Sequence, residues 1–278
     1  MDVCHKDAIK IIKDAGFDAY DFSFFRSKGD IDILGDDYIE RARDIRAYAD
    51  SIGAVCNQAH APFEMRSEQD FSQTSSAYVR ITRAIEAAAI LGASVIVVHP
   101  IKLPGERFYE INREFYRSLI PYARAHGGIK IGVENLFFFN HDVTRISGGV
   151  LDDPCDHEAF VRSLGLDDFC ACLDIGHTAV TGRKPEDAIS VMSPEVLLAL
   201  HVHDNDCVLD KHMMPYTASL DFEAICAALG KIGYRGDMTL ELISAARRIP
   251  EGAIPEAFRL YSAIARELIK KVEAARAQ

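Results

Sequence analysis

The sequence lacks several features that would define a protein class at once. It has no run of about 18 uncharged apolar residues, so we expect no membrane-spanning helix. Its first residues, MDVCHKDAIKIIKDAG, contain no long apolar stretch and no small-residue cleavage site, so we expect no signal peptide. Its seven cysteines are odd in number and show no CxxC spacing, which favours reduced thiols over a disulfide framework. These absences predict a cytoplasmic protein without a membrane partner.

Positive charge is also scarce. The chain has 31 Lys+Arg against 42 Asp+Glu, which gives a formal net charge of −11. This balance makes a nucleic-acid partner unlikely on composition, although a local basic groove remains compatible with it. No GxGxxG or Walker loop is present, so no motif supports a nucleotide-binding fold. With 49% hydrophobic and 26% charged residues, the 278-residue chain has the profile of an ordinary globular protein.

Apolar runs of strand length alternate with amphipathic stretches of helix length. The expected strands are Ala19–Phe25, Ala54–His60, Ser94–His99, Ile129–Glu134, Phe169–Asp174, Leu197–His203 and Asp237–Leu242. The expected helices are Asp7–Ala15, Tyr38–Ile52, Tyr78–Leu91, Asn112–Ala125, Pro185–Met192, Phe222–Leu229 and Pro255–Ala274. Runs such as SVIVVHP predict strands that are covered on both faces, as in a parallel sheet. Several expected helices stop at a glycine, as helix C-caps do: Gly16, Gly53, Gly92, Gly127 and Gly230.

Repeated βα units without a break in composition predict one α/β domain over residues 1–278, closed as a (β/α)8 TIM barrel. Only seven strands are clear, so the first strand is either the short segment Met1–Cys4 or missing. A doubly wound open sheet is the alternative topology. The longest irregular stretches follow strands, where barrels build their active sites. They are Ala61–Ser75, Phe137–Asp156 and Asp204–Asp221.

Nearly every expected strand ends in a side chain that can bind a metal ion or transfer a proton. These side chains are His60, His99, Glu134, Asp174, His203 and Glu241, and just beyond strand ends lie His177, Asp210 and His212. In a barrel the strand ends share one face, so the nine groups should converge. Charged groups there are costly to desolvate unless they are paired, and a divalent cation would pair them. Nitrogen and carboxylate ligands suit Zn²⁺, Mn²⁺ or Co²⁺ better than Ca²⁺.

Simpler interpretations compete at single positions. A lone histidine at a strand end is more often a hydrogen-bonded structural residue, whereas six such ends together predict a metal site. His201 shares the face of His203 but lies one layer deeper, so we expect a structural or supporting role. Asn135 could orient Glu134 or contact substrate. The run Phe137–Phe139 could wall a substrate pocket, pack a lid or form an oligomer interface.

The C-terminal helix carries an apolar stripe at helical spacing. The stripe consists of Ala257, Leu260, Ala263, Ile264 and Leu268. Such a stripe most simply packs on the barrel, but a contact between the subunits of a homo-oligomer would look the same.

The ordered set GVENL, CLDIGH, HVHDND and TLEL resembles the xylose-isomerase-like TIM-barrel superfamily, which holds sugar phosphate isomerases and epimerases, ketose 3-epimerases and endonuclease IV. The resemblance runs from AGFDAYDFS to the last barrel helix. It implies one divalent metal ion (Zn²⁺ or Mn²⁺ favoured, Co²⁺ or Mg²⁺ also suited) at Glu134, Asp174, His203 and Glu241. It also implies that Glu134 and Glu241 move a proton on a sugar or sugar phosphate through a metal-stabilised enediolate, while His177 binds a hydroxyl of the substrate.

Members that resemble endonuclease IV hold three zinc ions with additional ligands. The matching positions here are His60, His99, His177, Asp210 and His212. The resemblance therefore also implies an alternative function, a zinc phosphodiesterase that acts as an AP endonuclease. The loops after His60 and His203 are acidic, which disfavours DNA as the substrate.

Two departures from the sugar-handling members concern one loop. MMPYTAS stands where many relatives carry a PGxG turn, and no epimerase-type arginine follows His203. The second departure weakens an assignment to free-ketose 3-epimerisation in particular. A non-catalytic barrel that binds a metal or small ligand is the third hypothesis, and the presence of both Glu134 and Glu241 argues against it.

Overall fold

The computed structural model describes residues 4–25, 32–63, 71–103, 105, 107–140, 142, 145–242 and 249–277. The chain divides into two compact units. Unit 1 comprises Met1–Val133 and Leu164–Phe169, and unit 2 comprises Glu134–Ser163 and Cys170–Gln278. The expectation of one domain over the whole chain stays a prediction.

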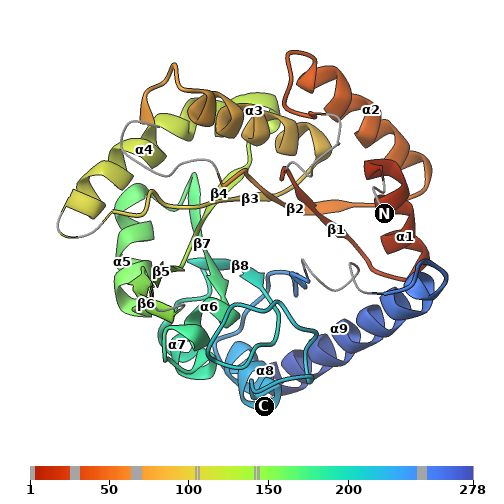
Figure 1. The fold of residues 1–278 in the computed structure, drawn as a ribbon, viewed down its shortest axis with the longest axis vertical. Helices are drawn as coiled ribbons and strands as arrows, with labels where there is room; N and C mark the ends of the chain where they lie inside the picture. Colours follow the sequence, from red (N-terminus) through yellow and green to blue (C-terminus); the bar gives the residue numbers. More distant parts are fainter. Residues whose placement is uncertain are drawn as a thin grey trace. The chain divides into compact units, whose positions relative to one another are not determined.

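Unit 1 alternates strands and helices in the expected way. Its elements are α1 (His5–Asp14), β1 (Tyr20–Ser23), α2 (Tyr38–Ser51), β2 (Cys56–His60), α3 (Ser76–Leu91), β3 (Val95–Val98), α4 (Arg107–Arg124), the 3₁₀ turn η2 (Ala125–Gly127) and β4 (Lys130–Glu134, whose last residue belongs to unit 2). The strands pair in parallel in chain order, β1-β2-β3-β4 (Figure 1). Each helix returns the chain to the start of the next strand, which is the βα arrangement that the sequence predicts.

The middle strand of unit 1 shows why its sequence is continuously apolar. All four residues of β3 are buried, and Ile96 and Val97 are fully so. On the helix side, the Tyr116 hydroxyl of α4 donates to the Val98 carbonyl at 2.7 Å. A strand that is covered on both faces needs apolar side chains at every position, so the VIVV run follows from its place in the sheet.

Unit 2 combines a parallel strand pair with a hairpin. Its elements are β5 (Leu136–Asn140), β6 (Arg145–Val150), α5 (Pro154–Leu164, whose last residue belongs to unit 1), β7 (Phe169–Asp174, whose first residue belongs to unit 1), α6 (Ile175–Val180), α7 (Pro185–Val191), β8 (Leu197–His201), α8 (Phe222–Lys231), the 3₁₀ turn η3 (Glu251–Ala253) and α9 (Ile254–Arg276). Strands β7 and β8 are parallel, and β5 and β6 form an antiparallel hairpin. A parallel bridge joins Val202, just after β8, to Leu240.

Several expectations about elements need correction. The irregular stretch expected at 137–156 holds most of the β5–β6 hairpin and the start of α5, and the strand expected at 237–242 is reduced to the bridge at Leu240. The packed face of α9 matches the predicted stripe only in part. Leu268 of the stripe is buried, but Leu260 is 52% exposed, and Tyr261 and Ala265, which were not predicted, are buried. Both series keep helical spacing, so spacing alone could not choose between them.

The question of a first strand falls largely on residues 1–3, which lie outside the described residues; α1 begins at His5. None of the helices in the described part of the chain is long and apolar enough to cross a membrane.

Gly230, predicted as a helix C-cap, has a different structural role. Gly16, Gly53, Gly92 and Gly127 have positive φ, as expected, but Gly230 lies inside α8 and the left-handed residue is Gly233, with φ 74°. Helix α8 packs against α9 (Figure 1). A Cβ added at Gly230 would lie 2.4 Å from the Ala275 Cβ and 2.7 Å from the Val272 carbonyl oxygen of α9. Gly230 therefore permits the close approach of two helices.

Gly230→Ala should destabilise the protein by about 1–3 kcal/mol, because the added methyl overpacks the α8–α9 contact. In an uncrowded helix the same change would be stabilising, so the sign of the effect tests the packing. Urea unfolding measures it. Gly252→Ala in η3 is the matched control, because a Cβ there meets nothing within 4 Å. An equal free energy of unfolding for the two variants would contradict the assignment.

Candidate metal centre

The carboxylates and imidazoles of unit 2 meet because strands end beside one another. Glu134 ends β4, Asp174 ends β7 and His201 ends β8. Glu241 follows the Val202–Leu240 bridge, and its N–H donates to the Val202 carbonyl at 3.1 Å. Glu134, Asp174 and His201 are all at least 99% buried. The polar residue after each apolar run is thus carried to one place by the local strand geometry.

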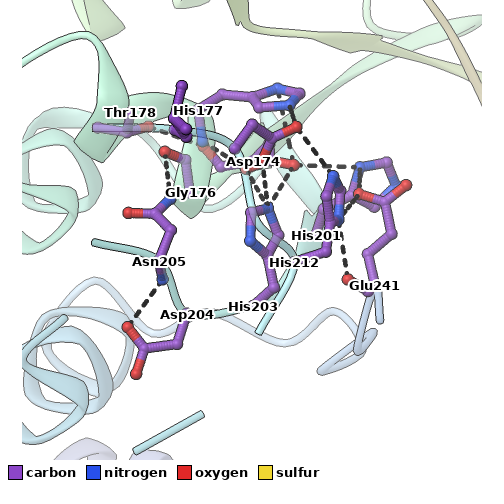
Figure 2. A network of polar contacts seen from close by, with 12 residues as sticks. Asp174, Gly176, His177, Thr178, His201, His203, Asp204, Asn205, His212 and Glu241 are labelled. Carbon is purple, nitrogen blue, oxygen red and sulfur yellow. Dashed lines mark hydrogen bonds and ion pairs between the residues drawn. The ribbon is translucent and has the colours of Figure 1, made fainter. Parts of the chain in front are cut away.

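A central group is built around His201 (Figure 2). Its Nδ1 lies 3.0 Å from the Glu134 Oε1 and 3.4 Å from the Glu241 Oε2. Ligand atoms of Glu134, Asp174, His201 and Glu241 all lie within 4.8 Å of one another. Such a set of oxygen and nitrogen donors can hold a divalent cation. The residue expected to lie one layer deeper thus contacts both proposed proton-transfer carboxylates.

His203 lies beside the same group and faces Asp174. Its Nε2 is 3.1 Å from the Asp174 Oδ1, and its ring stacks on His212 with centroids 4.1 Å apart. It also forms a possible ligand set with His212 and Glu241. Both His201 and His203 can therefore supply a nitrogen ligand, and the assignment of this role to His203 stays a prediction.

An outer group consists of His177, Asp210 and His212. The Asp210 Oδ2 lies 3.4 Å from the His177 Nε2 and 2.9 Å from the His212 Nε2. The other ring nitrogen of His177 lies 2.9 Å from the Asn135 carbonyl oxygen, and that of His212 lies 3.0 Å from the Glu241 carbonyl oxygen. A carbonyl only accepts, so the Nδ1 atom of each ring carries a proton, and both Nε2 atoms face Asp210.

The electrostatics of the site follow from crowding acids in a buried space. Burial by itself would lower the pKa of His177, but the charges of Asp174, Asp210 and Glu134 raise it to about 10. Burial would also lower the pKa of His212, but the charges of Asp210 and Glu241 outweigh burial and raise this pKa to about 9. Without a cation, the imidazoles hold protons to balance the carboxylates.

The residues present fit a divalent metal ion. Among the described residues, the buried Asp210 Oδ1 and His203 Nδ1 have no hydrogen-bond partner. Buried polar atoms of native proteins are nearly always satisfied, so these two indicate a missing partner of the site. The donors are imidazole nitrogens and carboxylate oxygens, which suit Zn²⁺, Mn²⁺ or Co²⁺.

Asn135 is buried, and its side-chain amide forms hydrogen bonds with other residues of the protein. Its Nδ2 donates to the Asp174 carbonyl at 3.1 Å, and its Oδ1 accepts from the Asp174 N–H at 2.8 Å. It also donates to the Thr178 hydroxyl oxygen at 3.2 Å. The amide thereby joins the residue after β4 to the end of β7. This geometry favours an orienting role for Asn135. The substrate-binding role expected for it stays a prediction.

Phe137 of the hairpin packs on His177. The two rings meet edge to face with centroids 5.0 Å apart. The first residue of the aromatic run thus lies against a side chain of the outer group, which is compatible with the wall of a pocket.

Two predicted ligands lie in unit 1. His60 ends β2 and is buried, and His99 follows β3; their ring centroids are 4.8 Å apart. Aromatic rings surround the pair. Phe63 stacks on His99 at 4.2 Å and Phe25 lies 5.0 Å from His60. The sequence brings these two histidines together, and their role as additional metal ligands stays a prediction.

Asp204 and Asn205 have no role in the sequence analysis, yet both are fully buried beside the site (Figure 2). The signal was present in the HVHDND motif, where several polar residues directly follow an apolar strand.

Similarity to known proteins shows the fold. An uncharacterised protein of Methanocaldococcus jannaschii is 27% identical over 168 residues, which cover 58% of this chain and only 55% of that protein. A solved D-tagatose 3-epimerase-like protein superimposes with a TM-score of 0.74 at 20% identity, covering 96% of this chain and 94% of the other. A D-psicose 3-epimerase solved in the presence of D-fructose gives a TM-score of 0.69 at 20% identity, with 95% and 93% covered.

The family model of the xylose isomerase-like TIM barrel matches residues 9–264. This match, together with the solved structures, confirms the predicted TIM-barrel fold class. The chain belongs to the xylose isomerase-like TIM barrel family.

Proposed function

We propose that the protein is a divalent-metal-dependent isomerase or epimerase of a sugar or a sugar-like hydroxycarbonyl compound. The observation that carries this proposal is the central group, in which Glu134 and Glu241 both contact the His201 Nδ1 beside Asp174. The solved D-tagatose 3-epimerase-like protein and D-psicose 3-epimerase, named for sugar chemistry, support it.

The residues that would hold the metal ion are Glu134, Asp174, Glu241 and an imidazole, either His203 or His201. A divalent ion bound there supplies a positive charge that polarises a carbonyl and its neighbouring hydroxyl and so acidifies the C–H bond between them.

Glu134 and Glu241 then do the proton chemistry. One carboxylate removes the proton from the substrate carbon, and the other, protonated beforehand, returns a proton to the same or the neighbouring carbon. Each turnover moves one proton onto one carboxylate and one off the other, so no oxidant or reductant is needed. The Nε2 of His177 faces Asp210, and His177 would bind a substrate hydroxyl.

A zinc phosphodiesterase is the second candidate, and the outer group favours it. His177, Asp210 and His212 form a second possible ligand set next to the central group. Two neighbouring ions are the arrangement that stabilises the attacking and leaving oxygens of a phosphodiester. The net charge of −11 weighs against a polyanionic substrate, so sugar chemistry remains our proposal.

Glu241→Gln should abolish isomerase or epimerase turnover, by about 10²-fold or more, because an amide cannot take up a proton. Glu251→Gln, on the exposed turn η3, is the matched control and should turn over like the wild type. Isomerisation of a panel of ketoses and inosose-like compounds measures the effect, with thermal unfolding as a check of the fold. Near wild-type turnover in Glu241→Gln would show that this carboxylate does not transfer the proton.

His203→Asn should weaken binding of the first metal ion more than His201→Asn does, if His203 is the nitrogen ligand as predicted. Elemental analysis of protein purified without chelator, followed by Mn²⁺ titration of the metal-free protein, measures affinity and stoichiometry. The reverse order would assign the ligand role to His201. Wild-type protein that holds two or three zinc ions would make phosphoester hydrolysis the next assay, and failure to take up any divalent ion would exclude both proposed reactions.

The metal-free protein should lose stability as the pH rises above about 6.5. The pKa of His212 is raised from 6.5 to about 9 and that of His177 to about 10, so the folded state binds more protons than the unfolded state between these values. Stability therefore falls with rising pH. Urea unfolding between pH 6.5 and 8.5, below the titration of exposed thiols, measures this slope.

His212→Gln is the control, because it removes one of the histidines whose pKa is raised and should flatten the slope. A free energy of unfolding that stays level or rises over this range in the metal-free wild type would refute the charge balance described for the site.

A further inference from the structure

A carboxylate beside the metal centre is used by none of the chemistry proposed above. Asp204, three residues after the end of β8, is fully buried. Its side chain accepts four backbone hydrogen bonds: Oδ1 from Asn205 at 2.9 Å, Ser219 at 3.0 Å and Leu220 at 3.0 Å, and Oδ2 from Ala218 at 2.7 Å. So many amide donors around one carboxylate make a strong local anchor.

What the anchor holds is the segment 205–220, here called the site loop. Beyond the side-chain bonds, the backbone of Asp204 pairs with Met213 in both directions, at 2.7 and 2.8 Å. The middle and the end of the site loop are therefore both fastened to one residue. Asp210 and His212, two members of the outer group, lie between Asn205, whose N–H is also bonded to the Asp204 carboxylate, and the backbone pair at Met213.

Asn205 ties the start of the site loop to helix α6. Its Nδ2 donates to the Gly176 carbonyl at 3.0 Å (Figure 2), and its Oδ1 accepts from the Cys207 N–H at 2.8 Å. Gly176 directly precedes His177, the third member of the outer group. A Cβ at Gly176 would lie 1.9 Å from the His203 Cε1, so this part of α6 is also packed closely against the site.

The site loop needs such an anchor because its backbone is not relaxed. Cys207, His212 and Tyr216 have φ values of 58°, 46° and 69°, in the left-handed region that side chains other than glycine rarely adopt. Such residues persist only where the surroundings determine the conformation. His212 is itself one of these residues, so its position depends on the fastenings on either side of it.

We propose that Asp204 is the positioning residue of the outer group: its carboxylate sets the site loop so that Asp210 and His212 meet His177 as a second metal-binding position. This inference rests on the second candidate function proposed above, in which the outer group takes a divalent ion of its own. Asp204 itself binds neither ion, since backbone N–H groups occupy its oxygens.

Asp204→Asn tests this role with a change of almost equal volume. The amide keeps one acceptor and places N–H donors against backbone N–H donors. Two measurements follow it: amide hydrogen exchange of residues 213–220, and titration of the metal-free protein with Co²⁺ by its visible absorption. We expect exchange in this segment to rise at least tenfold, and the affinity for the second Co²⁺ to fall about tenfold or more while the first is retained.

Asp221→Asn is the matched control. Asp221 caps α8 by accepting from the Ala224 N–H, and asparagine caps a helix equally well. It should leave both measurements unchanged. Unchanged exchange in Asp204→Asn would show that the carboxylate is not the anchor. Raised exchange with unchanged affinity for the second ion would show that it is an anchor without a positioning role.

Asn205→Asp keeps the proposal testable if Asp204→Asn does not fold. It retains the acceptor for the Cys207 N–H but replaces the donor to the Gly176 carbonyl by an acceptor. The second Co²⁺ should again bind more weakly, and unchanged binding would overturn the proposed link to α6. A wild-type chain that takes up one ion only would refute the second metal position and with it the second candidate function, whereas failure of the positioning role of Asp204 is read from the variants.

Discussion

The constraint on which the site depends is that several carboxylates are buried within reach of one another. Glu134 and Asp174 are almost entirely inaccessible to solvent, and Glu241 and Asp210 are largely so. Like charges in a space of low dielectric constant repel strongly, and the structure places an imidazole against each of them. The raised pKa values of His177 and His212 are the sign of this balance. A divalent cation would take over the task and release the protons, so the same arrangement that is costly without metal becomes a binding site with it.

The cluster is held in place by residues that neither bind the metal ion nor transfer a proton in the proposed chemistry. Asn135 joins the residue after β4 to the end of β7 through both of its amide atoms, and Asp204 gathers the two fastenings of the site loop. These side chains act by hydrogen bonds to the backbone, which fix the position of the chain. The carboxylates and imidazoles can then be aimed by rigid strand ends, although part of the set is supplied by a loop in a strained conformation.

Much of this could be read from the sequence, because strand ends are marked by a change from apolar to polar residues. The runs that end in Glu134 and Asp174 were expected as strands and are strands, and the family match confirms the TIM-barrel class. Helix α6 was missed because it begins at once after β7, with Asp174 itself as its cap, and leaves no connecting turn to recognise. The half-buried β5–β6 hairpin shows no clear alternation of apolar and polar residues in its sequence. The place of His201 in the site depends on how β8 packs against the segment that carries Glu241, and this tertiary contact is not encoded locally.

The difference between strand ends and loops also explains why the motifs indicate a reaction but not a substrate. The groups that would bind metal and move protons come from strand ends, where a parallel sheet leaves little freedom. The segments that would contact the rest of a substrate are the site loop and the hairpin, and Phe137 of the hairpin already lies on His177. In this chain the site loop carries MMPYTAS in place of a glycine-rich turn, and left-handed residues such as His212 stand where glycine would be relaxed. If Asp204 and Asn205 hold the site loop as proposed, the loop is shaped before any ligand arrives, and we expect the selectivity of the site to follow this chain's own loop sequence more than the ligand pattern that it shares with its family.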